Sequence, residues 1–272
     1  MRIATWNINS IRVRLDLMLD VFNKYDIDVL LLQETKSQDK DFPREAIEYN
    51  NLNVAFVGQK SYNGVAIISK HPMEVVQKSL PFYNYCNNDD EARYIECLVE
   101  YQGKVVRVAS VYVPNGNSAE AETKDVTETE RFKYKINFYK RLIEYKKQVL
   151  TQNEDYVFFA GDYNVAHREI DLHAPKYAFG DVGFHPVEIA KLDEIIDLGY
   201  QDTFRHFYKD EIAYTWWDYR HGRWQKDQGW RIDYIFCPQK TIEFINNVNI
   251  IKEVRGYEKT SDHTLVVVDF RL

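Results

Sequence analysis

The residues of this sequence that could hold a metal ion or transfer a proton stand at the ends of its apolar segments. They lie beside IATW, DVLLLQ, VRVASVYVP, YVFFAG and TLVVVDF, and they are Asn7, Glu34, Tyr112, Asn115, Asp162, Asn164, Asp262 and His263. Carboxylate and carboxamide oxygens are the hard ligands that Mg²⁺ or Mn²⁺ prefers. Because strand ends in layered α/β proteins converge on one crevice, the pattern predicts a divalent-metal site with proton-transfer groups around it.

Each of these residues taken alone also has an ordinary structural explanation. Asn7 could cap a turn, Glu34 could pair with a lysine, and Asp162 in GDYN could form an Asx-turn. The chemical agreement among several strand ends favours the metal site over these separate explanations.

The segments that must position these residues are predicted from their periodicity. A helix should follow Ser10 as its cap, with Leu15, Leu19 and Phe22 on its apolar face, and further helices are expected at about 128–149 and between 187 and 208. Strands are expected near 3–7, 28–32, 53–58, 64–69, 92–100, 104–113, 156–162, 213–220, 230–237, 246–254 and 264–270, with turns at Asn63-Gly64 and Gln102-Gly103.

The helix at 128–149 is predicted to bury one apolar face. Phe132, Ile136, Tyr139 and Ile143 recur on that face, which would leave the lysines pointing outward. The basic face is then either simply solvated or a contact for DNA.

Composition indicates a globular enzyme with one domain over residues 1–272. Hydrophobic residues make up 45% of the 272 positions, and no run approaches the roughly 18 apolar residues of a membrane span. The beginning of the sequence lacks the pattern of a secretory signal, so we expect a cytoplasmic protein without a membrane partner. Three cysteines without close pairing, Cys86, Cys97 and Cys237, are expected to be reduced and packed.

The net charge, 35 − 42 = −7, weighs against nonspecific binding of nucleic acid. The charges are segregated, however. Residues 119–130 hold five acids and one lysine, whereas residues 131–147 hold seven bases and one acid. A metal held by Glu34, Asp162, Asp233 and Asp262 would also offset their repulsion of a phosphate.

Eight motifs in their order along the chain resemble the exonuclease III and AP endonuclease family, within the endonuclease/exonuclease/phosphatase superfamily. They are TWNINSIR at 5–12, LLQETK at 31–36, NGVAIIS at 63–69, EARYI at 91–95, SVYVPNG at 110–116, GDYNVAHREID at 161–171, WRIDYIF at 230–236 and SDH at 261–263. The resemblance covers almost the whole chain. It implies an α/β fold, a four-layer α/β sandwich in which two β-sheets pack face to face with helices outside.

The resemblance also implies roles for the residues at the strand ends. Glu34 would be the principal metal-ligand carboxylate, and the implied metal site is completed by Asn7, Asp162, Asn164, Asp262 and His263. Asp233 would hold the imidazole of His263 toward the phosphate. Asp162 would activate water or protonate the leaving oxygen, two roles that stay open.

Two further catalytic roles follow from the same resemblance. Asn164 would orient the nucleophile or steady the transition state. Tyr112 would be the active-site tyrosine, which hydrogen-bonds the phosphate or approaches it as a phenolate; packing at a strand end is the alternative.

The aromatic segment YTWWDYRHGRWQKDQGWRID at 214–233 bears on the substrate. By the resemblance, Trp216 and Trp230 would wall a pocket for an abasic sugar, too tight for a nucleotide with its base. Filling of the core is the alternative, which we favour for Trp217. Arg93 and Asn115 match positions that touch the DNA backbone, although Arg93 could instead be a salt-bridged surface residue.

The implied function is a DNA-repair phosphodiesterase. It would be a Mg²⁺-dependent AP endonuclease, with Mn²⁺ as a substitute, that incises 5′ to abasic sites and also has 3′–5′ exodeoxyribonuclease and 3′-end-trimming activity. Its partner would be double-stranded DNA with abasic sites or blocked 3′ ends, and the protein would act as a monomer. The alternatives are a superfamily phosphatase on a non-DNA phosphoester and an inactive DNA-binding scaffold.

Three features depart from the family pattern. The acidic loop at 116–130 carries no family residue that contacts DNA. Ala178 and Asp181 stand where some relatives have amides. His167, His173 and His185 are expected to be surface residues.

Overall fold

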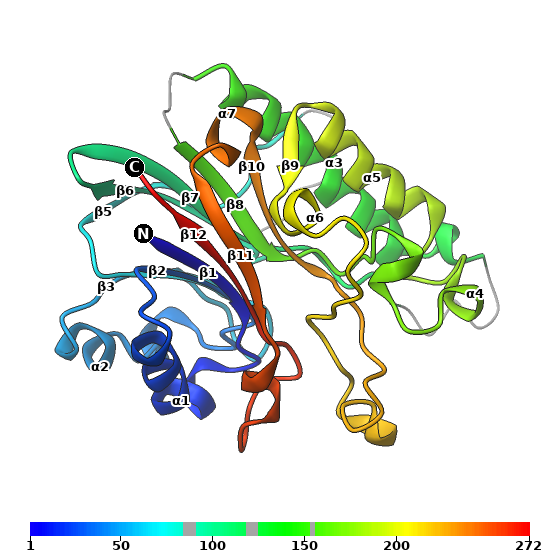
Figure 1. Cartoon of the computed structure of the whole chain (residues 1–272), viewed down its shortest axis with the longest axis horizontal. Coiled ribbons are helices and arrows are strands. Elements are labelled where there is room, and N and C mark those ends of the chain that lie inside the picture. Colours follow the sequence, from blue (N-terminus) through cyan, green and yellow to red (C-terminus); the bar gives the residue numbers. More distant parts are fainter. Residues whose placement is uncertain (84–90, 118–124, 153–155) are drawn as a thin grey trace.

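A computed structural model of the chain describes residues 1–83, 91–117, 125–152 and 156–272. The described strands form two mixed sheets of six strands each (Figure 1). The first contains, in spatial order, β11 (Ile245–Ile251), β12 (Leu265–Phe270), β1 (Arg2–Asn7), β2 (Val29–Gln33), β4 (Val65–Ser69) and β3 (Asn53–Val57). The second contains β5 (Met73–Gln77), β6 (Tyr94–Tyr101), β7 (Lys104–Tyr112), β8 (Tyr156–Asp162), β10 (Asp233–Pro238) and β9 (Tyr200–Asp202).

The two sheets repeat one sequence of pairings. In each, a parallel pair lies at the centre, β1 with β2 and β7 with β8, and the other strands add antiparallel on both sides. Four buried strands, β1, β2, β7 and β8, therefore form the centres of the two sheets. This arrangement brings the residues that follow those strands to one edge of the molecule.

The sheets pack face to face, and the helices cover their outer faces. Alternate residues of one sheet, such as Val29 and Leu31, form a common core with residues of the other, such as Val106 and Val108. The intervening residues face outward and pack under the helices. The described helices are α1 (Ile11–Lys24), α2 (Arg44–Tyr49), α3 (Glu130–Leu150), α4 (Pro175–Ala178), α5 (Pro186–Asp197), α6 (Thr203–Phe207) and α7 (Gln239–Ile242). The four-layer sandwich expected from the family resemblance is confirmed.

Helix α3 differs from its prediction, because its lysines do not all point outward. Lys135 and Lys146 are fully buried. They belong to a stripe at helical spacing that also contains Phe132, Tyr139 and Leu142. Each ammonium faces a buried carboxylate, which is why a lysine is tolerated in this stripe.

Two other predictions of local structure were wrong, and a third is confirmed only in the position of the residue. No strand forms at 213–220; within this described segment Trp216 makes only isolated bridges, to Trp230 and His263. Strand β10 starts at Asp233 rather than at 230, because the amide of Arg231 donates to the carbonyl of Asp171 instead of to a strand. Ser10 precedes α1 without a capping bond from its side chain; its backbone has φ 88°, and its amide donates to the carbonyl of Glu34.

Strands β5 and β9 were not predicted, because both are short edge strands. The Gln102-Gly103 turn between β6 and β7 is confirmed, and both of its residues have the positive φ that a two-residue hairpin needs. Cys97 and Cys237 are buried free thiols. Cys86 and residues 118–124 of the acidic segment lie outside the described residues. Among the helices described, none combines the length and the apolarity that crossing a membrane requires.

Candidate active site

The residues at the strand ends lie together around one cavity. The parallel register pairs Asn7 with Gln33, the residue before Glu34, and pairs Tyr112 with Asp162. The cavity has a volume of about 400 Å³ and is lined by Glu34, Tyr112, Asn115, Asn117, Asp162, Asn164, Val182, Gly183, Trp216, Trp230, Ile232, Asp262 and His263. Most of the predicted site residues are thus on its wall; Asn7, Asp233 and Arg93 are buried and do not line it.

Asn7 links the two carboxylates from its buried position. Its Nδ2 donates to Glu34 Oε1 at 3.1 Å and to Asp162 Oδ2 at 3.0 Å. Glu34 Oε1 also accepts a hydrogen bond of 2.6 Å from the hydroxyl of Tyr112. Burial, reinforced by the Glu34 and Asp162 charges, raises the pKa of Tyr112 well above its ordinary value. The tyrosine therefore acts as a neutral phenol that donates to Glu34, which disfavours the phenolate alternative.

Glu34 is held in an unusual backbone conformation by its neighbours. Its φ is 50°, in the left-handed region that costs a non-glycine residue on the order of 1 kcal/mol or more. Its Oε2 pairs with Lys36 Nζ at 2.8 Å, and the same ammonium donates to Asn9 Oδ1 at 2.7 Å. Burial would raise the pKa of Glu34, but Lys36 together with the bonds from Tyr112 and Asn7 lowers it. Glu34 is therefore ionised, as a metal ligand must be.

His263 lies between two buried aspartates. Its Nδ1 is 2.8 Å from Asp233 Oδ2, and its Nε2 is 3.7 Å from Asp162 Oδ2. Burial alone would lower the pKa of His263, but the Asp233 and Asp162 charges outweigh burial and raise it to about 10. The imidazole is therefore protonated at neutral pH and directs a positive charge toward Asp162.

Asp162 has the opposite shift from most carboxylates. Burial raises its pKa to about 7, although the charge of His263 acts against this. Its Oδ1 accepts a bond of 2.9 Å from the amide of Asn164, so the side chain is fixed. A carboxyl whose pKa lies near neutrality can take up and release a proton at working pH.

Two groups of residues could be considered as metal ligands. Ligand atoms of Asp162, Asp233 and His263 lie within 4.8 Å of one another. The Nδ1 of His263 is already engaged by Asp233 Oδ2, however, so two of the ligand atoms of this group are used by each other. The carboxylates of Glu34 and Asp162, with Asn7 between them, fit Mg²⁺ or Mn²⁺ better, because these metals take oxygen ligands. The side chain of Asn7 turns its Nδ2 toward the two carboxylates, while its Oδ1 accepts from the amide of Asn9.

Asn164 and Asn115 are joined side chain to side chain. Asn115 Nδ2 donates to Asn164 Oδ1 at 3.0 Å, and Asn164 Nδ2 donates to the carbonyl of Val113 at 2.9 Å. Asn164 adopts φ 53°, a conformation that asparagine tolerates better than most residues. The loops that follow β7 and β8 are therefore tied to each other at the cavity.

Trp216 and Trp230 form a corner of the cavity. Their ring centroids are 6.3 Å apart with planes at 88°, and Trp216 Nε1 donates to Asp262 Oδ2 at 2.9 Å. Asp262 Oδ1 accepts a hydrogen bond from Asn9 Nδ2, and Asn9 Oδ1 accepts one from Lys36 Nζ, which pairs with Glu34. Asp262 is therefore connected to Glu34 through Asn9 and Lys36. Trp217 is fully buried, as expected.

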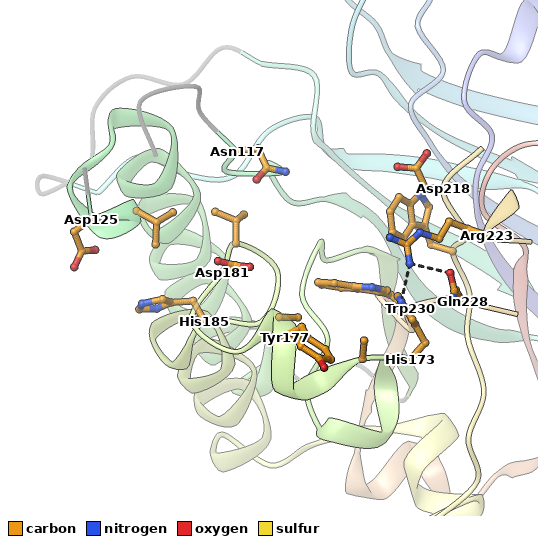
Figure 2. A pocket seen from close by; sticks show the side chains of 16 residues that line it. Asn117, Asp125, His173, Tyr177, Asp181, His185, Asp218, Arg223, Gln228 and Trp230 are labelled. Carbon is orange, nitrogen blue, oxygen red and sulfur yellow. Dashed lines mark hydrogen bonds between the residues drawn. The ribbon is translucent and has the colours of Figure 1, made fainter. Parts of the chain in front are cut away.

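The same two tryptophans also border a second, larger cavity of about 760 Å³. Figure 2 shows this cavity between Trp230, Arg223 and Gln228 on one side and His185, Asp181 and Asn117 on the other. Arg223 Nη1 contacts His173 Nε2 and Gln228 Oε1, each at 2.9 Å.

The three histidines expected on the surface are half-buried, and each has a partner. His167 pairs with Asp193, His173 contacts Arg223, and His185 caps α5 by accepting from the amide of Val187.

Arg93 is not the exposed surface residue that the alternative explanation required. It is 9% exposed, its Nε pairs with Glu91 at 2.5 Å, and its guanidinium lies 4.8 Å from the ring centroid of Tyr112. Arg93 therefore supports Tyr112 from behind, and its contact with the DNA backbone remains a prediction.

Four residues near the cavity were not predicted. Lys36 stands two residues after Glu34 in LLQETK, so its proximity was available from the motif. Asn9 likewise stands two residues after Asn7 in TWNINSIR. Gly183 and Lys135 reach the site only through tertiary packing, and no local pattern marks them.

Comparisons with known proteins agree with this geometry. A model described as the Endonuclease/Exonuclease/phosphatase family matches residues 4–263. An exodeoxyribonuclease of Bacillus subtilis (strain 168) is 33% identical over 267 residues, which cover 97% of this chain and 96% of that protein. Among solved structures, a 3′ phosphatase from Neisseria bound to a product DNA hairpin has 30% identity and a TM-score of 0.89. An AP endonuclease from Archaeoglobus fulgidus has 31% identity and a TM-score of 0.86, and each of these two structures matches over 100% of both chains.

The chain belongs to the endonuclease/exonuclease/phosphatase family, whose model spans nearly all of it. Within that family it falls in the group of exonuclease III and AP endonucleases, which are metal-dependent hydrolytic nucleases.

Proposed function

We propose that this protein is a Mg²⁺-dependent DNA-repair phosphodiesterase that incises DNA 5′ to abasic sites and trims 3′ ends. The 3′ activities would be 3′–5′ exodeoxyribonuclease and removal of blocking groups. The observation that carries the proposal is a single cavity. It has the Asp162, His263 and Glu34 cluster on one wall and the Trp216–Trp230 corner on another.

The chain's own residues would divide the reaction among them. The protonated imidazole of His263 would bind a non-bridging oxygen of the phosphate, held in place by Asp233. Water would attack the phosphorus, and the bond from phosphorus to the 3′-oxygen would break. Asp162 would be the group that transfers the proton, and Asn164 would orient the attacking water.

A bound Mg²⁺ would polarise the phosphate and offset its charge. Glu34 would be the main ligand, with Asn7, Asp162 and Asp262 nearby. Mn²⁺ has the same preference for oxygen and should substitute.

The tryptophan corner supports an abasic sugar as the occupant. Aromatic walls favour the apolar face of a deoxyribose, and extrusion of a sugar without a base forfeits little stacking. The partner would be double-stranded DNA with abasic sites or blocked 3′ ends. We further propose that residues 1–272 act as one domain, as a monomer and in the cytoplasm.

The test is a cleavage assay with Mg²⁺ and a duplex that carries one abasic-site analogue. An undamaged duplex and the Asp162→Asn variant serve as controls, and a chelator removes the metal. We expect metal-dependent incision on the 5′ side of the lesion by the wild type only. If folded, metal-loaded protein cuts neither duplex, the proposal fails and a phosphatase or an inactive scaffold takes its place.

A further inference from the structure

Two side chains outside the cavity wall, Lys135 of α3 and Glu188 of α5, form an ion pair directly behind the active-site loops. Both are fully buried, and the two helices lie side by side on the outer face of the second sheet (Figure 1). Burial of two charges has a large desolvation cost, so a pair in this position needs further partners to be tolerated.

The partners of Lys135 are backbone carbonyls of two site residues. Its Nζ donates to the carbonyl of Asn115 at 3.0 Å and to the carbonyl of Asn164 at 2.8 Å. Glu188 Oε1 is the third neighbour of the ammonium and pairs with it by charge. Gly116 packs against the stem of Lys135, because a Cβ at Gly116 would lie 2.9 Å from Lys135 Cδ. Lys135 thus ties together the loop after β7 and the loop after β8.

The partners of Glu188 lie in a third loop. Its Oε2 accepts hydrogen bonds from the amide of Gly183 at 2.8 Å and from the amide of His185 at 3.2 Å. Gly183 lines the active-site cavity and packs closely against Trp230, since a Cβ at Gly183 would lie 2.9 Å from Trp230 Cζ3. Glu188 therefore holds the loop that sets the position of Trp230.

We propose that Lys135 and Glu188 are positioning residues that lock three active-site loops, at 113–117, 162–166 and 183–185, into the arrangement needed for cleavage. This inference rests on the proposed function and assigns a role to residues that do not touch the substrate. The lock acts on Asn164 through its backbone and on the tryptophan corner through Gly183.

The same helix provides a matched control. Lys146 of α3 and Glu96 of β6 form a second fully buried pair, with a Nζ to Oε1 distance of 2.8 Å. Lys146 also donates to the hydroxyl of Tyr94, and none of its side-chain bonds within the described part of the chain reaches a residue that lines the cavity. The double variants Lys135→Met/Glu188→Gln and Lys146→Met/Glu96→Gln each remove one positive and one negative charge and differ in their distance from the site. The second variant also leaves Arg107 without its carboxylate, so it should be at least as destabilised as the first.

The experiment measures cleavage of the abasic duplex with Mg²⁺, thermal unfolding, and amide hydrogen exchange for the wild type and both double variants. We expect both variants to lose stability. Only Lys135→Met/Glu188→Gln should lose kcat, by about 100-fold, since small misplacements of reacting groups have effects of this size. Its KM should change by less than about threefold. Exchange should accelerate in peptides from the three loops for this variant alone.

Equal losses of kcat in the two double variants, or unchanged loop exchange in Lys135→Met/Glu188→Gln, would overturn the inference. If Lys135→Met/Glu188→Gln does not fold, the kcat of the single variant Lys135→Arg is measured in its place. The guanidinium keeps the charge opposite Glu188 but displaces the two carbonyls, so kcat should still fall about tenfold or more; wild-type kcat would overturn the inference. A wild type that cuts no DNA contradicts the proposed function instead, and the exchange data still test the loop arrangement.

Discussion

At the residue scale, the pair formed by Asp233 and His263 is the most constrained contact of the site. Asp233→Asn keeps the size of the side chain but removes the charge that holds the imidazole as a cation. We expect kcat to fall by roughly 100- to 10,000-fold with the fold retained. Steady-state cleavage of the abasic duplex, alongside circular dichroism, measures this.

The control for that substitution is Asp193→Asn. Asp193 pairs with His167 at 2.7 Å, which makes a second aspartate–histidine contact away from the cavity. This variant should cleave like the wild type. Equal activity in Asp233→Asn and Asp193→Asn would contradict the assigned role of Asp233.

The hydroxyl of Tyr112 makes a bond to a charged group, Glu34 Oε1, at 2.6 Å. Such bonds contribute about 1.5–3 kcal/mol, so Tyr112→Phe should lower kcat/KM about 10- to 100-fold. The matched variant Tyr208→Phe removes a hydroxyl that bonds Asn247 outside the site. It should leave kcat/KM unchanged; a loss as large as that of Tyr112→Phe would show that the effect is not specific to Glu34.

At the scale of elements, the loop before α5 presses against the tryptophan corner. Gly183 and Gly180 have nearly the same φ, 93° and 92°, but a Cβ at Gly183 would meet Trp230, whereas Gly180 has nothing within 4 Å. Substitution of either by alanine should destabilise the fold by about 1–2 kcal/mol through backbone strain. Only Gly183→Ala should also reduce incision at the abasic site.

The two alanine variants are compared by urea unfolding and by the rate of incision at equal folded fractions. If Gly180→Ala reduces incision as much as Gly183→Ala does, loop strain and not contact with Trp230 is responsible.

The central buried strands and the residues at their ends could be predicted from the sequence. Buried strands carry local signals, namely apolar runs and turns, and Asn7, Glu34 and Asp162 follow directly from where those runs end. The burial of Lys135 could not be predicted by treating charge as a mark of exposure. The spacing of Phe132, Lys135 and Tyr139 puts all three on one face of the helix. Only the folded structure shows that Glu188 lies opposite Lys135 and pairs with it.

At 213–220 the sequence predicts a strand that the structure does not form. Its aromatic and threonine residues have high strand propensity, yet Trp216 pairs only through isolated bridges to Trp230 and His263. Tertiary contacts override propensity in this loop. The left-handed φ of Glu34 was likewise not predictable, because glutamate has no preference for that conformation.

At the scale of the whole molecule, stability at acid pH depends on buried carboxylates such as Glu96. Burial would raise its pKa, but Lys146 and Arg107 outweigh burial and lower it to about 2. The ordinary pKa of a glutamate is about 4.5, so Glu96 stabilises the fold above that pH, and the stabilisation is lost as the pH falls toward 2. Burial lowers the pKa of Lys146, but its titration belongs to alkaline pH.

Glu96→Gln should therefore destabilise the protein by roughly 3–5 kcal/mol at neutral pH, because it leaves Lys146 and Arg107 without their carboxylate. The difference from the wild type should shrink between about pH 5 and about pH 2. Urea unfolding at several pH values measures it, and a difference that stays constant across this range would contradict the assignment.

The pairing of β1 with β12 has a consequence for how the enzyme is made. The Met1 ammonium donates to the carbonyl of Phe270 at 2.8 Å, and β12 completes the sheet in which β1 and β2 lie. Ribosomes add about 5–20 residues per second, so β12, the antiparallel partner of β1, is synthesised many seconds after β1. His263 arrives with the same late segment. A chain that ends before β12 therefore has Asn7 and Glu34 but lacks both His263 and the strand that pairs with β1.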